Sequence, residues 1–415
     1  MISYLEQINN KELVKKYLNR VCQGWNKIDS LLIEATNACN LNCVMCKRTI
    51  EKKENGFMDI ITWKEIIDDL PNLNVKAITP FWYGEPFLHP NIIEMLEYAF
   101  DKNYNIDYDK QLKIIKDAKD ENLLKDFTLK NNYNNHCFEY MEIHTNGNLL
   151  DKEKIDFLFS EKSVRSLKYL VFSIDANCKK TYDKIRQGGD FDKVINNIKY
   201  CLELKKNKKG PILVLQFIVM KENYEEAEQF VDFWKKEFDD NGIPCQINGG
   251  YEPAFEKDTI FLRVLGDLEM EKQPEAWKLH DQVISKSKHF TKNKKYEEVN
   301  DKEYVRNPCA GPFKTPVINW NGEVGICCYD YNMSMKLGNV KDLKLSYLWN
   351  LDKVMKKRFD HINGDFNGVC ENCINLNSPQ ITDEEIVEYL MNVNKDKIIS
   401  YLQRTKNFKL MKRFI

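Results

Sequence analysis

The sequence predicts an α/β fold in which a parallel sheet is followed by a second, smaller domain. From about residue 31 to residue 250, short β-rich runs alternate with helical patterns, which is typical of repeated βα units. After a highly charged stretch, the composition changes at Asn307-Pro308-Cys309. The 415 residues also exceed what one hydrophobic core usually supports. We therefore expect two or three structural units.

Six candidate strands form the expected sheet. They span residues 31–36, 75–82, 140–145, 167–175, 212–219 and 244–248. One helical pattern covers residues 91–100, and another has apolar side chains spaced i, i+3, i+4 and i+7. That apolar stripe consists of Phe191, Val194, Ile195, Ile198, Cys201 and Leu202. We expect the stripe to pack on the sheet.

The domain organisation is expected to have five parts. They are a helical N-terminal extension (1–30), the sheet domain (31–253) with a charged insert at 101–139 that contains a helix near 109–119, a charged linker (254–306), the small domain (307–379) and a basic helical tail (380–415). The small domain should contain a hairpin of residues 317–320 and 323–328. Its turn is predicted at Asn321-Gly322, because Asn-Gly favours two-residue hairpin turns.

Charge and hydropathy exclude several classes of protein. With 62 basic and 63 acidic residues, the chain has no general reason to bind nucleic acid. It has neither a membrane-length apolar run nor a signal-peptide pattern, so we expect a cytoplasmic protein whose thirteen cysteines stay reduced. From Lys395 onward, seven basic residues alternate with apolar ones. This tail is either a solvated helix or a contact with anionic lipid.

A group of three cysteines follows the first predicted strand. Cys39, Cys43 and Cys46 have the spacing Cys-x3-Cys-x2-Cys on one loop. Three such thiolates can bind three irons of a [4Fe–4S] cluster and leave the fourth iron open. A structural zinc site is the alternative, but zinc needs a fourth ligand, and the next candidate is His89.

Around these cysteines the sequence resembles the radical S-adenosylmethionine (radical SAM) superfamily. Besides the cysteine loop, the matching motifs are Tyr83-Gly84-Glu85-Pro86, Thr145-Asn146-Gly147, Ser173-Ile174-Asp175, Arg186 and Val219-Met220-Lys221-Glu222-Asn223. The motifs lie at or shortly after the C-terminal ends of predicted strands, where ligand sites of parallel barrels gather. Two residues depart from the family pattern: Tyr83 replaces a glycine, and Met45 replaces a residue that is often aromatic.

The resemblance implies a partial (β/α)6 barrel, similar to a TIM barrel, and an enzyme that cleaves S-adenosylmethionine (SAM). The open iron would bind SAM, and an electron donor such as flavodoxin or ferredoxin would reduce the cluster. By the same resemblance, SAM would be contacted by Gly84 and Glu85 at its amino group, by Ser173 and Arg186 at its ribose or carboxylate, and by Val219 and Met45 at its adenine.

The small domain resembles the auxiliary-cluster domains called SPASM and Twitch. The resemblance implies that Cys309, Cys327, Cys370 and Cys373 ligate all four irons of a second [4Fe–4S] cluster, which would transfer electrons. A four-thiolate zinc site is the alternative. Cys328 competes with Cys327, but neighbours on a strand point to opposite faces and the glycine spacing favours Cys327.

A single closed auxiliary cluster is similar to that of Twitch-type dehydrogenases of aminocyclitols. This resemblance implies oxidation of a small polar molecule such as a sugar- or cyclitol-like alcohol. Asp330 is either the proton acceptor or a hairpin cap, and Cys245 is either a hydrogen donor or a buried structural thiol. The alternatives to this function are a peptide-modifying SPASM maturase and a non-catalytic iron–sulfur electron carrier.

Overall fold

A single mixed sheet organises the molecule. The computed structural model describes residues 25–104, 136–250, 255–266, 273–290, 306–371, 373 and 381–414. The strands are β1 (Lys27–Ile33), β2 (Asn74–Thr79), β3 (Phe138–Thr145), β4 (Leu167–Ser173), β5 (Ile212–Val219), β6 (Cys245–Gly250), β7 (Asp258–Val264), β8 (Val317–Ile318), β9 (Glu323–Gly325) and β10 (Lys336–Asn339). Their order is β10-β9-β8-β1-β2-β3-β4-β5-β7-β6, and all neighbours from β8 to β6 are parallel.

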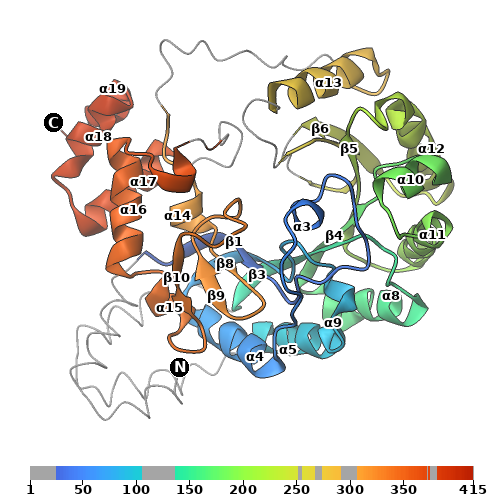
Figure 1. Cartoon of the computed structure of the whole chain (residues 1–415), viewed down its shortest axis with the longest axis horizontal. Helices are drawn as coiled ribbons and strands as arrows, with labels where there is room; N and C mark the ends of the chain where they lie inside the picture. The colour runs from blue at the N-terminus through green and yellow to red at the C-terminus, as the bar shows by residue number, and fades with distance from the viewer. Residues whose placement is uncertain are drawn as a thin grey trace.

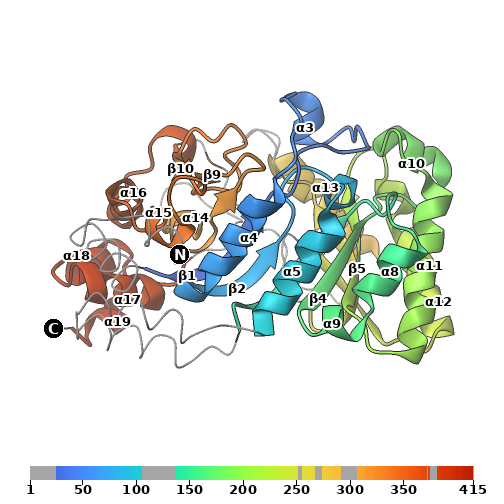
Figure 2. The same ribbon diagram turned by 90° about the horizontal axis from the view of Figure 1, so that it is seen from below.

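Helices cover the outer face of this sheet (Figure 1). In the barrel they are α4 (Ile60–Asp69), η1 (Leu70–Asn72), η2 (Pro86–Leu88), α5 (Ile92–Tyr104), α8 (Lys152–Leu158), α9 (Glu161–Val164), α10 (Lys179–Ile185), α11 (Phe191–Asn207), η3 (Tyr224–Glu226), α12 (Ala227–Asp240) and α13 (Gln273–Lys286). The short helix α3 (Lys47–Ile50) has no buried residue and lies at one end of the barrel (Figure 2). The predicted stripe on α11 is confirmed, because Val194, Ile198, Cys201 and Leu202 are buried in the core between helices and sheet.

The predicted partial barrel is therefore confirmed, but its sheet has a strand that the sequence analysis missed. β7 lies within residues 254–306, which were expected to be only a linker, and it pairs between β5 and β6. Six of its seven residues are buried. Asp258 and Arg263 made this segment look charged, but Asp258 is neutralised by Lys205 at 2.6 Å. The linker prediction is wrong for this segment.

Other predicted boundaries also differ from the structure. β1 begins at Lys27, inside the segment expected to be an N-terminal extension. α5 continues to Tyr104 and β3 begins at Phe138, which shortens the predicted insert at 101–139. The helix predicted near 109–119 lies outside the described residues.

The C-terminal domain continues the barrel sheet. The predicted hairpin is confirmed: β8 and β9 are antiparallel, and Gly322 has the positive φ of 90° that its turn requires. β8 also pairs in parallel with β1 through Leu32 and Val317, which the sequence did not indicate. The remaining helices are α14 (Gly311–Lys314), α15 (Leu345–Leu348), α16 (Asp352–Asn363), η4 (Gly368–Cys370), α17 (Asp383–Val393), α18 (Lys397–Arg404) and α19 (Phe408–Met411). Consequently the second cysteine group lies beside the barrel, as Figure 2 shows for β9, β10 and α14.

The basic tail folds onto the C-terminal domain. Ile398, Tyr401, Leu402 and Leu410 of α18 and α19 are buried in a cluster that also contains Trp25. Most of the apolar face of the tail is therefore used in packing, although Phe408 remains 54% exposed. Among the described residues, no helix is both long enough and apolar enough to cross a membrane.

Asp69, at the end of α4, holds the C-terminal domain to the barrel. Its two carboxylate oxygens accept hydrogen bonds from the backbone N and the Oγ of Ser346, both at 2.8 Å, and Asp69 is fully buried. Because Asp69→Ala removes both acceptors from a buried site, we expect it to lower the free energy of unfolding by about 3 kcal/mol. Asp68→Ala is the control: Asp68 is 41% exposed, so its loss should cost less than about 1 kcal/mol. If urea unfolding shows the same loss of unfolding free energy in both variants, Asp69 does not have this role.

Candidate active site and auxiliary cysteine site

Cys39, Cys43 and Cys46 are free thiols on the loop directly after β1. Burial raises the pKa of Cys39 to about 12 and also raises the pKa of Cys43. Each pKa is raised further by a neighbouring thiol, since Cys43 acts on Cys39 and Cys46 acts on Cys43. With their pKa values raised in this way, Cys39 and Cys43 are stable as thiolates only beside a cation. The loop therefore fits the three protein ligands of an open [4Fe–4S] cluster.

The loop with Gly84 and Glu85 is attached directly to the cysteine loop. The Glu85 backbone N donates to Ala38 O at 2.9 Å. The Glu85 carboxylate is buried and accepts hydrogen bonds from Thr145 Oγ1 and from the Asn146 backbone N, both at 2.8 Å. Desolvation raises its pKa to about 7. Asn146 Nδ2 in turn lies 3.8 Å from Cys39 Sγ, so three of the predicted motifs meet at one place.

The other predicted SAM contacts lie at different depths. Ser173 is half-buried at the end of β4. The neighbouring Phe172 points to the other side, into the core between the helices and the sheet, which we call the helix-packed core. Arg186 is buried, and its Nη1 lies 3.6 Å from Cys43 Sγ. Met45 is half-buried beside Cys46. The side chain of Val219 is fully buried in the helix-packed core, which leaves only its backbone for a ligand.

The structure brings the four predicted auxiliary cysteines together. Burial raises the pKa of Cys327, and the nearby thiols of Cys309, Cys373 and Cys370 raise it further. Burial likewise raises the pKa of Cys309 to about 11. Four converging thiols, of which Cys370 is buried and the others are partly buried, fit a fully ligated iron–sulfur cluster.

Cys328 points away from this group. Its side chain packs with Trp82, Tyr83 and Met333, and its carbonyl accepts a hydrogen bond from Trp82 Nε1 at 2.8 Å. We therefore expect Cys327→Ala to lose the auxiliary cluster, about four of about eight irons per chain, and Cys328→Ala to keep it. Iron analysis of the two reconstituted variants tests the assignment. It is wrong if the two variants behave in the opposite way.

The concave face of the barrel carries polar side chains beside an apolar cluster that includes Val171 and Val214. On β3, Met141 and Ile143 point into the helix-packed core, so Glu142 and His144 point to the concave face. Their side chains are 27% and 29% exposed, and His144 Nε2 lies 3.6 Å from Glu142 Oε2. Phe81 stacks on the His144 ring with a centroid distance of 5.5 Å. Sequence analysis missed this pair, although its i, i+2 spacing on a predicted strand was a usable signal.

The two predicted catalytic residues are occupied elsewhere. Asp330 is buried, and its oxygens accept hydrogen bonds from Ser334 Oγ at 2.8 Å and Met335 N at 2.7 Å. This is the geometry of the hairpin cap. Cys245 begins β6 and packs against the core between helices and sheet, with Lys235 of α12 nearby. These positions support neither a proton acceptor nor a hydrogen donor on the concave face.

Glu34 is a buried carboxyl that the sequence analysis did not select. It directly follows β1, and its carboxylate accepts hydrogen bonds from the backbone N of Tyr83, at 3.3 Å, and of Trp320. Desolvation raises its pKa to about 7, while the positive charge of Lys53 opposes that shift. Glu34 therefore joins the loop with Gly84 to the turn between β8 and β9 of the C-terminal domain, which we also call the auxiliary domain.

The raised pKa of Glu34 makes stability depend on pH. Because the folded state holds the proton more tightly than the unfolded state, the stabilisation is complete below about pH 4.5 and is lost as the pH rises through about 7. When the pH is raised from about 5 to about 8, the unfolding free energy of the wild type should fall by up to about 3 kcal/mol relative to that of Glu34→Gln. Urea unfolding of both proteins at the two pH values measures the difference. If the difference in unfolding free energy between the two proteins is the same at both pH values, the pKa of Glu34 is not raised.

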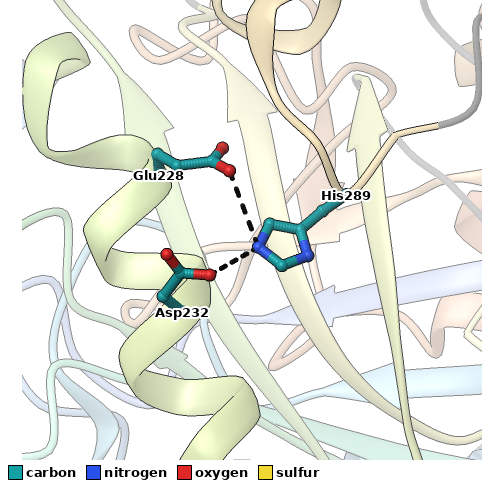
Figure 3. A group of neighbouring side chains, drawn as sticks. All are labelled: Glu228, Asp232 and His289. Atoms are coloured by element: carbon teal, nitrogen blue, oxygen red, sulfur yellow. Dashed lines mark hydrogen bonds and ion pairs between the residues drawn. The ribbon is translucent and has the colours of Figure 1, made fainter.

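A further charged group lies on the outer surface. Among the described residues, Glu228 and Asp232 of α12 and His289 could together hold a cation (Figure 3). His289 Nε2 lies 2.7 Å from Asp232 Oδ1 and 3.7 Å from Glu228 Oε1, and Lys288 Nζ lies 2.9 Å from the other oxygen of Asp232. Since Lys288 and His289 already contact these carboxylates, we interpret the group as a link between α12 and the segment after α13.

Comparison with protein families agrees with the fold and with this arrangement of cysteines. Residues 33–233 match the model of the Radical SAM superfamily, and residues 309–374 match that of an iron–sulfur cluster-binding domain, SPASM. The chain belongs to the radical SAM superfamily and is an enzyme that uses SAM, a [4Fe–4S] cluster and auxiliary iron–sulfur chemistry. This membership rules out the alternative of a non-catalytic electron carrier.

Among individual proteins, the chain is similar to a "tungsten-containing aldehyde ferredoxin oxidoreductase cofactor-modifying protein" of Pyrococcus furiosus. The two are 23% identical over 349 residues, which cover 79% of this chain and 83% of the relative. The mycofactocin maturase MftC of Mycobacterium tuberculosis is 33% identical over 79 residues, 19% of this chain and 18% of that protein. Streptococcus suis SuiB, bound to the precursor peptide SuiA, shares the fold with a TM-score of 0.50 and 16% identity, covering 83% of this chain and 70% of SuiB.

Proposed function

We propose that this radical SAM enzyme oxidises an alcohol-bearing carbon of a small, polar, sugar- or cyclitol-like molecule. The supporting observation is a group of polar side chains on the concave face of the barrel, where Glu142 and His144 are partly exposed beside Phe81. Ser173 and Gln216 continue this face on β4 and β5, because the residues flanking them on these strands point into the helix-packed core. These polar groups, beside the apolar side chains of Val171 and Val214, suit a molecule that has both hydroxyl groups and carbon-bound hydrogens on its surface.

The proposed reaction removes a hydrogen atom, a proton and an electron from the carbinol. When bound, SAM and its cluster supply the radical that takes the carbon-bound hydrogen, and the auxiliary cluster supplies the electron acceptor. The chain's own task is to accept the hydroxyl proton as the C=O bond forms. His144 is better placed for this than Asp330, because the Glu142 carboxylate stabilises the imidazolium formed on proton uptake.

The test uses reconstituted protein with SAM, a reduced flavodoxin or ferredoxin as the proposed electron donor, and cyclitols and amino sugars deuterated at the carbinol carbon. We expect deuterium in 5′-deoxyadenosine and a carbonyl product that is lighter by two hydrogens. His144→Gln should lower carbonyl formation by at least about a hundredfold while hydrogen abstraction continues. The matched control is His289→Gln, which changes a histidine that contacts α12 on the outer side of the barrel. Equal carbonyl yields in both variants would exclude His144 as the proton acceptor.

Peptide modification is the second candidate. It is supported by the similarity to a mycofactocin maturase and by the fold shared with SuiB, which was solved with a precursor peptide bound. If a short peptide encoded near this gene stimulates 5′-deoxyadenosine formation and no polyol does, the substrate is a peptide.

A further inference from the structure

The segment after α10 lies along the cysteine loop. Two backbone hydrogen bonds, with N···O distances of 2.9 and 3.0 Å, join residues 42–44 to residues 185–187. Cys43 and Arg186 are the central residues of these two segments. The pairing therefore holds the Arg186 side chain next to the Cys43 thiol.

The guanidinium of Arg186 is fixed in place by Asp175. Arg186 Nε donates to Asp175 Oδ2 at 2.9 Å, and Nη2 donates to the same oxygen. Asp175 is fully buried, and its other oxygen accepts a hydrogen bond from Ile218 N at 2.7 Å. Asp175 also has a positive φ of 61°, a left-handed backbone conformation that few residues other than glycine adopt and that its hydrogen bonds maintain. Arg186 therefore cannot swing away from the loop without leaving Asp175 buried and unpaired.

The remaining contact of this guanidinium is with sulfur. Arg186 Nη1 lies 3.6 Å from Cys43 Sγ, within hydrogen-bond range for a sulfur acceptor. A buried cationic donor at this distance stabilises negative charge on the sulfur.

We infer that Arg186 sets the reduction potential of the SAM-cleaving cluster by donating a hydrogen bond to the Cys43 sulfur, and that Asp175 is its positioning residue. Reduction adds one negative charge to the cluster, so a buried cation and donor at a ligand sulfur favour the reduced state. This inference rests on the proposed ligation by Cys43. It is compatible with SAM binding, because a guanidinium has five N–H groups and three are used here.

The first experiment is a redox titration of the reconstituted protein, followed by EPR of the cluster signal that SAM perturbs. Arg186→Gln is compared with Arg48→Gln, which also removes a positive charge at this loop. Arg48 donates to the carbonyls of Cys39 and Leu41 and not to a thiol. At fixed potential, Arg186→Gln should lower the ratio of reduced to oxidised cluster at least about tenfold, about 59 mV for one electron. Arg48→Gln should change it much less. Equal shifts in both variants would overturn the inference.

A second measurement does not depend on how well Arg186→Gln folds. In wild-type protein labelled with ¹⁵N-arginine, ENDOR of the reduced cluster should show a ¹⁵N coupling that persists in Arg48→Gln. Absence of any arginine coupling in the wild type, or its loss in Arg48→Gln, would refute the contact. A wild-type protein without a SAM-responsive signal would refute the cluster assignment, and with it both the proposed function and this inference.

Discussion

Cys43→Ala is expected to abolish formation of 5′-deoxyadenosine, by more than about a thousandfold, and to lower the iron content from about eight to about four per chain. Cys43 is buried between Arg186 and the other two thiols of its loop. Without its thiolate, only two protein ligands remain for a cluster that needs three. Anaerobic reconstitution, iron analysis and a product assay measure both effects.

The matched control is another buried cysteine. Cys201 lies on α11, fully buried in the helix-packed core and far in sequence from either cysteine group. Cys201→Ala should cost stability through a small cavity and leave iron content and SAM cleavage unchanged. Retained SAM cleavage in Cys43→Ala would contradict the assignment of the first cysteine group.

Gly84→Ala is expected to have the second-largest effect, a loss of more than about 3 kcal/mol in unfolding free energy together with loss of SAM binding. A Cβ at Gly84 would lie 1.8 Å from Thr36 O and 2.9 Å from Ala38 O. Both contacts are backbone atoms that cannot move without displacing the cysteine loop. The methyl group would therefore separate Glu85 from the site that it shares with Asn146 and Cys39.

Gly249→Ala is the control for Gly84. A Cβ at Gly249 would approach most closely the Ile284 Cδ1 atom at 2.6 Å, the end of a side chain that can rotate. We expect a loss of less than about 1.5 kcal/mol and normal SAM binding. Thermal unfolding and equilibrium dialysis with labelled SAM compare the two variants. Normal SAM binding by Gly84→Ala would show that the close approach of the two loops is unnecessary.

The sequence predicted the parts of the fold that depend on local patterns. Residues 212–219 form β5 with the predicted bounds, because an apolar run that only Gln216 interrupts is largely buried there. The two loops with Cys39 and Gly84 meet because both follow neighbouring parallel strands, β1 and β2. The meeting of these two loops could be predicted from the order of strands and motifs along the sequence alone.

Contacts between distant segments could not be predicted in the same way. β7 has a charged residue near each end, and only its pairing with β5 and its contact with Lys205 show why burial is favourable. Likewise, the sequence gives no sign that β8 joins β1, a pairing that makes barrel and auxiliary domain share one sheet. The pairing determines which residues lie between the two cysteine groups.

The same limit applies to the roles of single side chains. Arg186 was expected to contact SAM, but its position beside Cys43 and Asp175 depends on a backbone pairing about 140 residues apart in sequence. Tyr83, which departs from the family pattern, packs edge-on against Tyr331 of the auxiliary domain with a centroid distance of 4.7 Å. Its aromatic ring is explained by a contact between domains, which no local motif encodes.

The most direct test of the two-cluster account is EPR of the dithionite-reduced wild type, recorded with and without SAM. We predict two overlapping [4Fe–4S] signals, of which one changes when SAM binds its open iron and the other does not, because four thiolates already close that cluster. A single signal, or two signals that SAM leaves unchanged, would contradict the account.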